Sequence, residues 1–383
     1  MPHQNTTFRQ VTKRIPWAAL QRLVAQHGAD KGVRKLSTEQ LLLVLLFAQI
    51  SEARSLRDVP AILESQDARR YHSGLPNVAK STLADALATR PCAVFAGLLA
   101  SLIGQATGKL ARGIGECVRL IDSTPIRLNR LSADWARFSA EVCGAKAHVV
   151  LDPDAHCLLY LAITPANVND ITAAKAMPIQ AGATYVLDLG YYDYAWWAEL
   201  DAAACRIVTR LKTNTPLHVI ETLPIPPEVE TIRSDQIGFL PARLSRSRTN
   251  PMGQTAVREI KVEIKPGKVL RILTNDLDAP AAEVAALYKR RWDIELFFRW
   301  VKQNLKLRHF FGTSENAVRI QIAVAMIAFV LLRLAHGAQQ CIQSLTQFAR
   351  LVRANILHRR PLDQMRRTGS HRPVQNSAQG MLL

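Results

Sequence analysis

Acidic residues are scarce in this 383-residue chain. Its 31 Asp and Glu residues are outnumbered by 49 Lys and Arg residues, which gives a formal net charge of +18 at pH 7. Such an excess concentrates polyanions around a protein, and nucleic acid is the commonest polyanionic partner. Because basic ribosomal proteins and membrane-surface proteins share this excess, the charge indicates a class of partner but no activity.

Paired cysteines and long apolar runs are missing as well. The six cysteines occur singly, with no C-x-x-C pair and no zinc-ligand spacing, so we expect reduced thiols packed as small hydrophobic side chains. The longest apolar runs, 41–48 and 322–332, are shorter than the roughly 20 residues that span a bilayer. The N-terminal segment also lacks the apolar stretch of a secretory signal. We therefore expect a cytoplasmic protein without a membrane partner.

Residues 1–112 are expected to form a helical domain. Within it, the segment NVAKSTLADALATR favours a helix capped by Ser81 or Thr82. With a neighbouring helix, and with Lys80, Arg90 and polar residues in the first turn, this segment could form a helix-turn-helix that enters a DNA groove. A plain helical bundle is the alternative that the sequence leaves open.

From Glu116 onward the pattern changes to short strands bounded by turn residues. Residues 113–205 predict alternating strands and helices, with a hairpin that turns at DPDAH. Residues 206–275 are richer in Pro and predict a β-rich insertion. Residues 276–345 predict a long helix, from Asp278 and Pro280 to about Leu305, and then an apolar helix. Residues 346–383 carry many Arg and few acids, which favours a mobile basic tail.

The long helix contains the segment YKRRWDIELFFRWVK, which separates into two stripes at 100° per residue. One stripe holds Glu295 with Tyr288, Arg291, Arg299 and Lys302, and Trp292 lies beside it; the opposite stripe holds Ile294, Phe297, Val301 and Leu305. Asp293 lies off the charged stripe. Glu295 is therefore the candidate functional acid, and a solvated face with i,i+4 ion pairs is the alternative.

Two further acids follow apolar strands. Asp122 ends the strand VRLIDST, and Asp188 ends the strand YVLDLGYYD. Carboxylates at the carboxyl ends of neighbouring strands lie where α/β sheets bind ligands, although each could also be a turn residue or a helix cap. Oxygen ligands bind Mg²⁺, and the Arg, Lys and Tyr side chains around Glu295 suit phosphate oxygens.

These residues together resemble a known family. The pattern Tyr288-x₂-Arg291-x₃-Glu295-x₆-Lys302 matches the signature of the DDE transposases of bacterial insertion sequences, in particular insertion-sequence family four. The segments IDST and DLGYYD resemble the two Asp motifs of that family, in the same order. TPANVND and TRLK are similar to its segments between and after these motifs. The resemblance extends over residues 10–345.

The resemblance implies an α/β fold with a ribonuclease-H-like catalytic core, interrupted by the β-rich insertion and preceded by the helical DNA-binding domain. Asp122, Asp188 and Glu295 would bind two Mg²⁺ ions, for which Mn²⁺ could substitute, and would catalyse DNA cleavage and strand transfer. The side chains that would contact DNA are Tyr288, Arg291, Trp292, Arg299, Lys302, Arg210 and Lys212. Trp292 would stack on an extruded base, or it belongs to the core.

The resemblance implies two DNA partners, the terminal inverted repeats and the target, both bound as double strands by a homodimer. It implies no small-molecule substrate, and it places the protein at the nucleoid. Two alternatives remain: a nuclease that cuts without joining, and a catalytically idle DNA-binding descendant of a transposase. Trp196 and Trp197 are expected in the core, and His148 is expected to be a hydrogen-bonded strand histidine beside Lys146.

Overall fold

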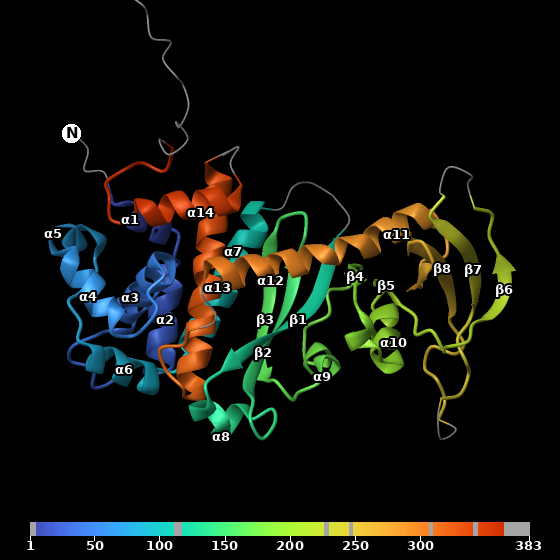
Figure 1. Ribbon diagram of the computed structural model, residues 1–383, viewed down its shortest axis with the longest axis horizontal. Coiled ribbons are helices and arrows are strands. Elements are labelled where there is room, and N and C mark those ends of the chain that lie inside the picture. The colour runs from blue at the N-terminus through green and yellow to red at the C-terminus, as the bar shows by residue number, and fades with distance from the viewer. Residues whose placement is uncertain are drawn as a thin grey trace, which may run out of the picture.

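The computed structural model describes residues 5–110, 117–225, 230–244, 248–305, 309–339 and 344–363. Helices of the N-terminal third lie at one end of an elongated molecule, and a long mixed sheet extends from them to the other end (Figure 1). One large hydrophobic core joins the N-terminal helices to one face of the sheet, and a second, smaller core covers the other face. The helical third and the sheet are therefore packed as one body.

The N-terminal third is helical, as expected. Its elements are α1 (Thr7–Thr12), α2 (Trp17–Gln26), α3 (Thr38–Ser51), α4 (Asp58–Ser65), α5 (Asp67–Arg70), the 3₁₀ turn Tyr71–Ser73, α6 (Lys80–Thr89) and α7 (Cys92–Leu110). α3 begins with a capping box between Ser37 and Gln40 and is apolar all round. Such a helix must be buried on every side, and residues 41–50 are all buried.

The expected cap of α6 was wrong. The helix begins at Lys80, so Ser81 and Thr82 lie within its first turn and cannot be its cap. The cap position is taken by Ala79, whose side chain makes no capping hydrogen bond. Arg90 is not exposed for DNA either: its Nη2 donates to the Leu36 carbonyl oxygen at 2.8 Å. Since the apolar side of α6 packs on helix α13 (Glu315–Ala338), the bundle alternative describes this region better than a free helix-turn-helix.

Nine strands form one sheet in the described part of the chain. They are β1 (Val118–Leu128), β2 (Cys143–Asp152), β3 (Cys157–Pro165), β4 (Thr184–Val186), β5 (Arg206–Arg210), β6 (His218–Thr222), β7 (Ile232–Phe239), β8 (Ala256–Lys265) and β9 (Lys268–Thr274). Their order is β3-β2-β1-β4-β5-β9-β8-β7-β6. β1, β4 and β5 are parallel, whereas the other neighbouring pairs are antiparallel. The expected hairpin at DPDAH joins β2 to β3.

Short helical elements connect the first five strands. They are the 3₁₀ turn Arg130–Ser132, α8 (Ala133–Ala136), α9 (Asp170–Lys175), the 3₁₀ turn Leu189–Tyr191 and α10 (Tyr194–Ala202). Strands β6 to β9 follow as an antiparallel meander that joins the sheet through β5 and β9. The segment 206–275 thus adds strands to the edge of the same sheet. Its first strand, β5, pairs with β4 as a parallel neighbour.

The expected long helix is two helices, α11 (Ala281–Arg290) and α12 (Trp292–Asn304), with Arg291 at the junction. α13 follows as the central helix of the large core. By length and composition α13 could cross a membrane, but 89% of its most apolar window is buried inside the protein. Its apolar character is thus explained by packing within the fold.

The expectation of a mobile tail from residue 346 is wrong for its first part. Helix α14 (Leu345–Ala354) packs against α12 and α13, and its Phe348 and Val352 are buried. The chain after it returns to the N-terminus, where the backbone nitrogen of Phe8 donates to the Ile356 carbonyl oxygen at 2.8 Å. Residues 364–383 of the expected tail lie outside the described residues.

Candidate active site

Asp122 and Asp188 are brought side by side by the register of two parallel strands. The last pair between β1 and β4 is Leu120 with Val186, and each aspartate lies two residues beyond it. Since side chains alternate along a strand, the position two residues on returns to the same face. The sheet therefore places both carboxylates at the point where β1 and β4 separate.

Backbone nitrogens orient the two carboxylates. The Oδ1 atom of Asp122 accepts from the Ser123 nitrogen at 2.7 Å, and that of Asp188 accepts from the Gly190 nitrogen at 2.7 Å. At Gly190 an added Cβ would lie 3.0 Å from Asp188 Oδ1 and 3.3 Å from the Oδ2 atom of Asp170, so a larger residue would crowd both carboxylates. Asp188 is thus also the cap of a 3₁₀ turn, as its position after a strand allowed.

Glu295 approaches the same point from α12, which packs on β1. The apolar stripe of this helix is buried as expected, including Ile294 and Val301. Arg291 connects the acids: its Nη2 donates to Glu295 Oε1 at 2.6 Å, and its Nη1 lies 3.8 Å from Asp122 Oδ2. The guanidinium is therefore located between a strand carboxylate and the helix carboxylate.

The electrostatics of Asp122 reflect this crowding. Burial raises the pKa of its carboxyl to about 6, and the negative charges of Asp188 and Glu295 act in the same direction. The Ser123 hydrogen bond and the positive charge of Arg291 oppose them. A cation beside Asp122 would stabilise its ionised form. In the described part of the chain, however, no three His, Cys, Asp or Glu side chains are arranged to hold a metal ion.

Comparisons with known proteins identify the family. The family described as Transposase DDE domain matches residues 113–331, more than half of the chain. A putative transposase, y4zB, of Sinorhizobium fredii is 40% identical over 74% of this chain and 79% of its own length. The chain belongs to the DDE transposase family. Its function is thus DNA transposition as part of an insertion sequence, and the predicted resemblance to the DDE transposases is confirmed.

Other similarities agree with this assignment. A probable transposase for the insertion sequence element IS5377 of Geobacillus stearothermophilus is 29% identical to this transposase, over 68% of each chain. The cryo-EM structure of the piggyBac transposase synaptic complex with hairpin DNA aligns with a TM-score of 0.50 at 10% identity, over 96% of this chain and 83% of that chain. That likeness concerns the fold. Residues 3–76 match a domain of unknown function.

Of the expected DNA-contacting side chains, Tyr288 and Arg210 lie close to the acids and are partly enclosed, whereas Lys212 is exposed beyond the end of β5. Tyr288 is buried, and burial raises the pKa of its phenol, which the nearby charges of Arg291 and Arg210 oppose. Arg210 ends β5 and is half-buried. Lys212 is exposed, and its Nζ lies 4.3 Å from the centre of the Tyr192 ring. These groups form the side of the transposase site nearest β5.

The remaining expected contacts line the outer side of α12. Trp292 is 51% exposed, which excludes the core alternative for this residue. Arg299 is exposed and Lys302 is half-buried. By contrast, Trp196 and Trp197 are fully buried in the smaller core, as expected.

One acid of the site was not among the sequence candidates. Asp170 begins α9, and its Oδ1 accepts from Ser123 Oγ at 2.8 Å and from Lys146 Nζ at 3.0 Å. His148, buried and hydrogen-bonded to Thr164 Oγ1 as expected of a strand histidine, has its Nδ1 3.8 Å from the same atom. The sequence did hold a signal for Asp170, because this residue ends the family-like segment TPANVND. Asp170 fixes the strand residue that follows Asp122.

Proposed function

We propose that this transposase cleaves DNA at the ends of its insertion sequence and joins the freed strand to a target, with Asp122, Asp188 and Glu295 as the catalytic acids. The observation that carries the proposal is their convergence: two parallel strands place Asp122 beside Asp188, and the Arg291 guanidinium lies between Asp122 and Glu295 of the packed helix. Three mutually repelling acids are costly for a fold and are typical of a functional site.

The sheet supports a ribonuclease-H-like core. In the order β3-β2-β1-β4-β5, the first three strands are antiparallel and the last two run parallel to β1. Asp122 lies within β1 just past its last pair with β4, and Asp188 follows the end of β4. Strands β6 to β9 then form the insertion between the second Asp and the Glu. The signature around Glu295 supports assignment to insertion-sequence family four.

The chemistry of the three carboxylates suits two Mg²⁺ ions, with Mn²⁺ as a substitute, because carboxylate oxygens are the ligands that these hard cations prefer. In the described structure the three side chains are not yet spaced to hold an ion, so binding would draw them together. Asp122, Asp188 and Glu295 would hold the ions. The raised pKa of Asp122 supports this fit, since a neighbouring cation would relieve the repulsion that burial and the other acids impose. When bound, the ions would activate water or a 3′-hydroxyl group and stabilise the leaving oxygen.

The other side chains of the site bind and orient the DNA. Arg291, freed from Glu295, donates to a phosphate oxygen, and Tyr288 supports it from the buried side. Lys302 and Arg299 contact neighbouring phosphates along α12, and Arg210 and Lys212 contact the backbone on the β5 side. Trp292, exposed next to the signature Arg, stacks on an extruded base.

The assembly follows from the reaction. Joining two element ends requires two active sites, so a homodimer on DNA bridges the two terminal inverted repeats before it takes up target DNA. The N-terminal helices read the repeats, and backbone phosphates supply most of the affinity. No small-molecule substrate takes part. The protein acts in the bacterial cytoplasm, at the nucleoid.

The test is an incubation of the purified chain with DNA that carries the element ends, a target plasmid and Mg²⁺. Joined products are expected. Cut products alone would favour a nuclease on the same core, and a gel shift without cutting would favour an idle DNA-binding descendant. Glu295→Gln should bind the ends as well as the wild type does and produce no cuts; a variant that still cuts would refute the assignment of the third acid.

A further inference from the structure

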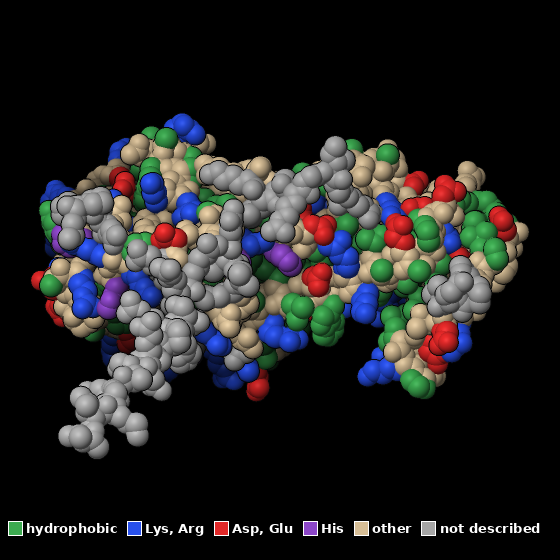
Figure 2. Space-filling model, turned by 90° about the horizontal axis from the view of Figure 1, so that it is seen from above, with side chains coloured by type: hydrophobic (Ala, Val, Ile, Leu, Met, Phe, Trp, Pro, Cys, Tyr) green, Lys and Arg blue, Asp and Glu red, His purple; other side chains and the backbone are tan. Residues whose placement is uncertain are grey.

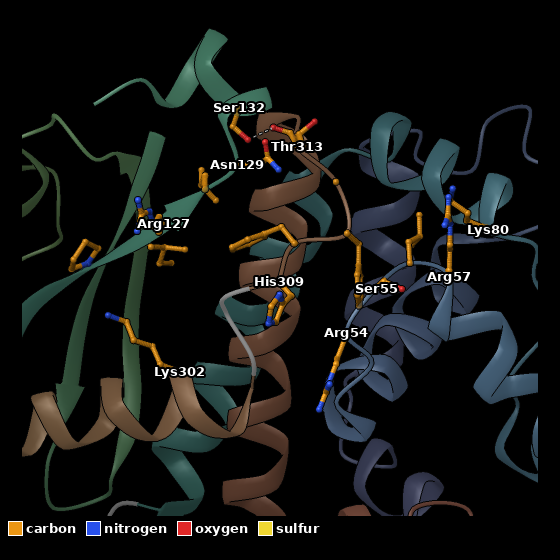
Figure 3. Close-up of a pocket in the computed structure, with 17 residues that line it drawn as sticks. Arg54, Ser55, Arg57, Lys80, Arg127, Asn129, Ser132, Lys302, His309 and Thr313 are labelled. Atoms are coloured by element: carbon orange, nitrogen blue, oxygen red, sulfur yellow. Dashed lines mark hydrogen bonds between the residues drawn. The ribbon is translucent and has the colours of Figure 1, made fainter. Parts of the chain in front are cut away.

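A large cleft separates the N-terminal helices from the sheet. It has a volume of about 1000 Å³ and three walls. Arg54 and Arg57 come from the connection between α3 and α4, and Lys80 begins α6, whereas Arg127 and Lys302 come from β1 and α12 (Figure 3). The third wall is the segment 309–313, with His309 between the other two walls (Figure 3).

The charge of the cleft has one sign. Five Lys and Arg side chains line it, and none of the described lining residues is acidic. Arg54, Arg57, Lys80 and Arg127 are all exposed. Like charges that face one cavity repel each other, and an anion with several charges relieves that repulsion. The cleft is therefore suited to a row of phosphates.

The cleft continues from the three acids. Lys302 lies seven residues after Glu295 on α12, which puts it on the same face about 10 Å along the helix axis. Arg127 lies five residues beyond Asp122 on β1, about 17 Å along the strand, and the alternation of side chains turns it to the opposite face, so it borders the cleft at the far end of the strand. Past Leu120, this strand has no β4 partner. A DNA strand leaving the acids along α12 therefore enters the cleft.

The third wall offers rings to bases and is held in place by hydrogen bonds. His309 is exposed, and Phe310 and Phe311 are half-buried. The buried Gln321 side chain donates to the His309 carbonyl oxygen and accepts from the Phe311 nitrogen, both at 2.8 Å. Ser132 Oγ also donates to the Thr313 carbonyl oxygen at 2.8 Å. Cations with aromatic rings on a preformed wall are typical of sites for unpaired nucleotides.

We infer that this cleft binds a few nucleotides of single-stranded DNA adjoining the phosphodiester held by the three acids. Its volume holds a short stretch of one strand and is too small for a turn of duplex. The phosphates lie along the five cations, and bases stack on the 309–311 wall. This inference rests on the proposed function, because it takes the acids as the place where the strand is cut.

Binding of a fluorescently labelled single-stranded oligonucleotide, followed by anisotropy over a KCl series in EDTA, tests the inference without any need for cleavage. The variant is Arg54→Ala/Arg57→Ala/Lys80→Ala in the full chain. The slope of log K against log [KCl] should become shallower by about 2, at about 0.7 for each lost phosphate contact with a single strand. The control is Arg22→Ala/Lys31→Ala/Lys35→Ala, which removes as many exposed cations from the same helical region outside the cleft. The control should keep the wild-type slope.

Two results would overturn the inference: equal losses in both triple variants, or a loss in the cleft variant on duplex DNA only. Circular dichroism melts confirm that both variants fold. Glu295→Gln separates this inference from the proposed function, since it should bind the single strand normally and fail to cut. If Glu295→Gln cuts, the proposed function fails, whatever the cleft variant does.

Discussion

The cations of the β6–β9 region and those of the cleft differ in what they face. In β7, β8 and β9 the arginines are paired: Arg258 with Asp235, and Arg271 with Glu259. In the cleft, the described lining contains no acid. The surface agrees, since Asp and Glu gather beside Lys and Arg at the β6–β9 end, whereas Lys and Arg predominate at the N-terminal end (Figure 2).

The comparison shows that a net charge of +18 is not a uniform signal of DNA binding. A paired, buried arginine holds strands together and has little charge left for a phosphate. An exposed arginine without an acidic neighbour contributes little to the fold and is available to a polyanion. Position within the fold therefore decides which of the basic residues serve DNA.

The largest effect on stability is expected from breaking the buried pair. In Arg258→Ala, the Asp235 carboxylate, which is 2% exposed, would lose the guanidinium that donates to it at 2.6 and 2.7 Å. Removing one partner of a buried ion pair costs about 3–5 kcal/mol. Urea unfolding measures it, with Arg57→Ala as the exposed control, expected to change stability by less than about 0.5 kcal/mol. Equal losses in the two variants would remove the distinction between paired and cleft arginines.

A smaller and pH-dependent effect is expected at Asp122. Because its pKa in the fold is about 6 against an ordinary 3.8, the folded state binds the proton more tightly than the unfolded state does. Ionisation of Asp122 therefore lowers the free energy of unfolding as pH rises from about 4 to 6. Above this window the full decrease, up to about 3 kcal/mol, remains. Asp122→Asn should thus stabilise the metal-free protein at pH 8 and leave it unchanged near pH 3.5. Thermal melts at both pH values measure this, and equal melting temperatures at pH 8 would contradict it.

Trp292 extends the comparison to an uncharged side chain. Because the indole is 51% exposed, Trp292→Ala should leave the melting temperature nearly unchanged. Loss of stacking should weaken binding to DNA with an unpaired base at the cleavage position by about 1–3 kcal/mol. Anisotropy with and without the unpaired base measures the difference. Trp197→Ala, in the buried core, is the contrasting variant and should unfold at lower temperature with no specific effect on the unpaired base.

The smallest effect is expected from the last twenty residues. A deletion of 364–383 removes Arg366, Arg367 and Arg372 and leaves α14 intact. If these arginines contact duplex phosphates, the salt slope of end binding becomes shallower by up to about 3, at about 0.9 for each contact. An unchanged slope would mean that the segment is not on the DNA. The deletion must begin after Asp363, because Val352 and Leu362 are buried.

The sequence predicted the parts of the fold that follow from local pattern. The two stripes of α12, the β2–β3 hairpin and the burial of Trp196 and Trp197 are all visible in periodicity or turn residues. The helix break at Arg291 was not, because the segment has helical propensity throughout and only tertiary contacts with Glu295 and Asp122 distinguish this residue. The packing of α14 was missed because the arginine-rich segment after it drew attention away from its apolar face.

The residues of the candidate site also differ in whether the local sequence marks them. Asp188 was found because it follows a strand, and Glu295 because it lies on a charged helix stripe. Asp122 was expected to end its strand, and that was wrong: β1 continues to Leu128 through its pairing with β2, and only the pairing with β4 stops at Leu120.

Asp170 was not found, because its partners Ser123 and Lys146 lie 47 and 24 positions away, and only the sheet brings them together. The cleft depends on elements from both ends of the chain, so no local pattern could predict it.

The central claim is that Asp122, Asp188 and Glu295 hold the catalytic metal ions. A change of metal specificity at Asp188 tests this claim most directly. Asp188→Cys replaces a hard oxygen ligand with a softer sulfur, which Mg²⁺ binds poorly and Mn²⁺ accepts more readily. The account predicts no cleavage of end-containing DNA by this variant in Mg²⁺ and recovered cleavage in Mn²⁺, while Asp293→Cys, off the charged stripe, cuts in both. Cleavage by Asp188→Cys in Mg²⁺ at the wild-type rate would contradict the claim that Asp188 holds the catalytic metal.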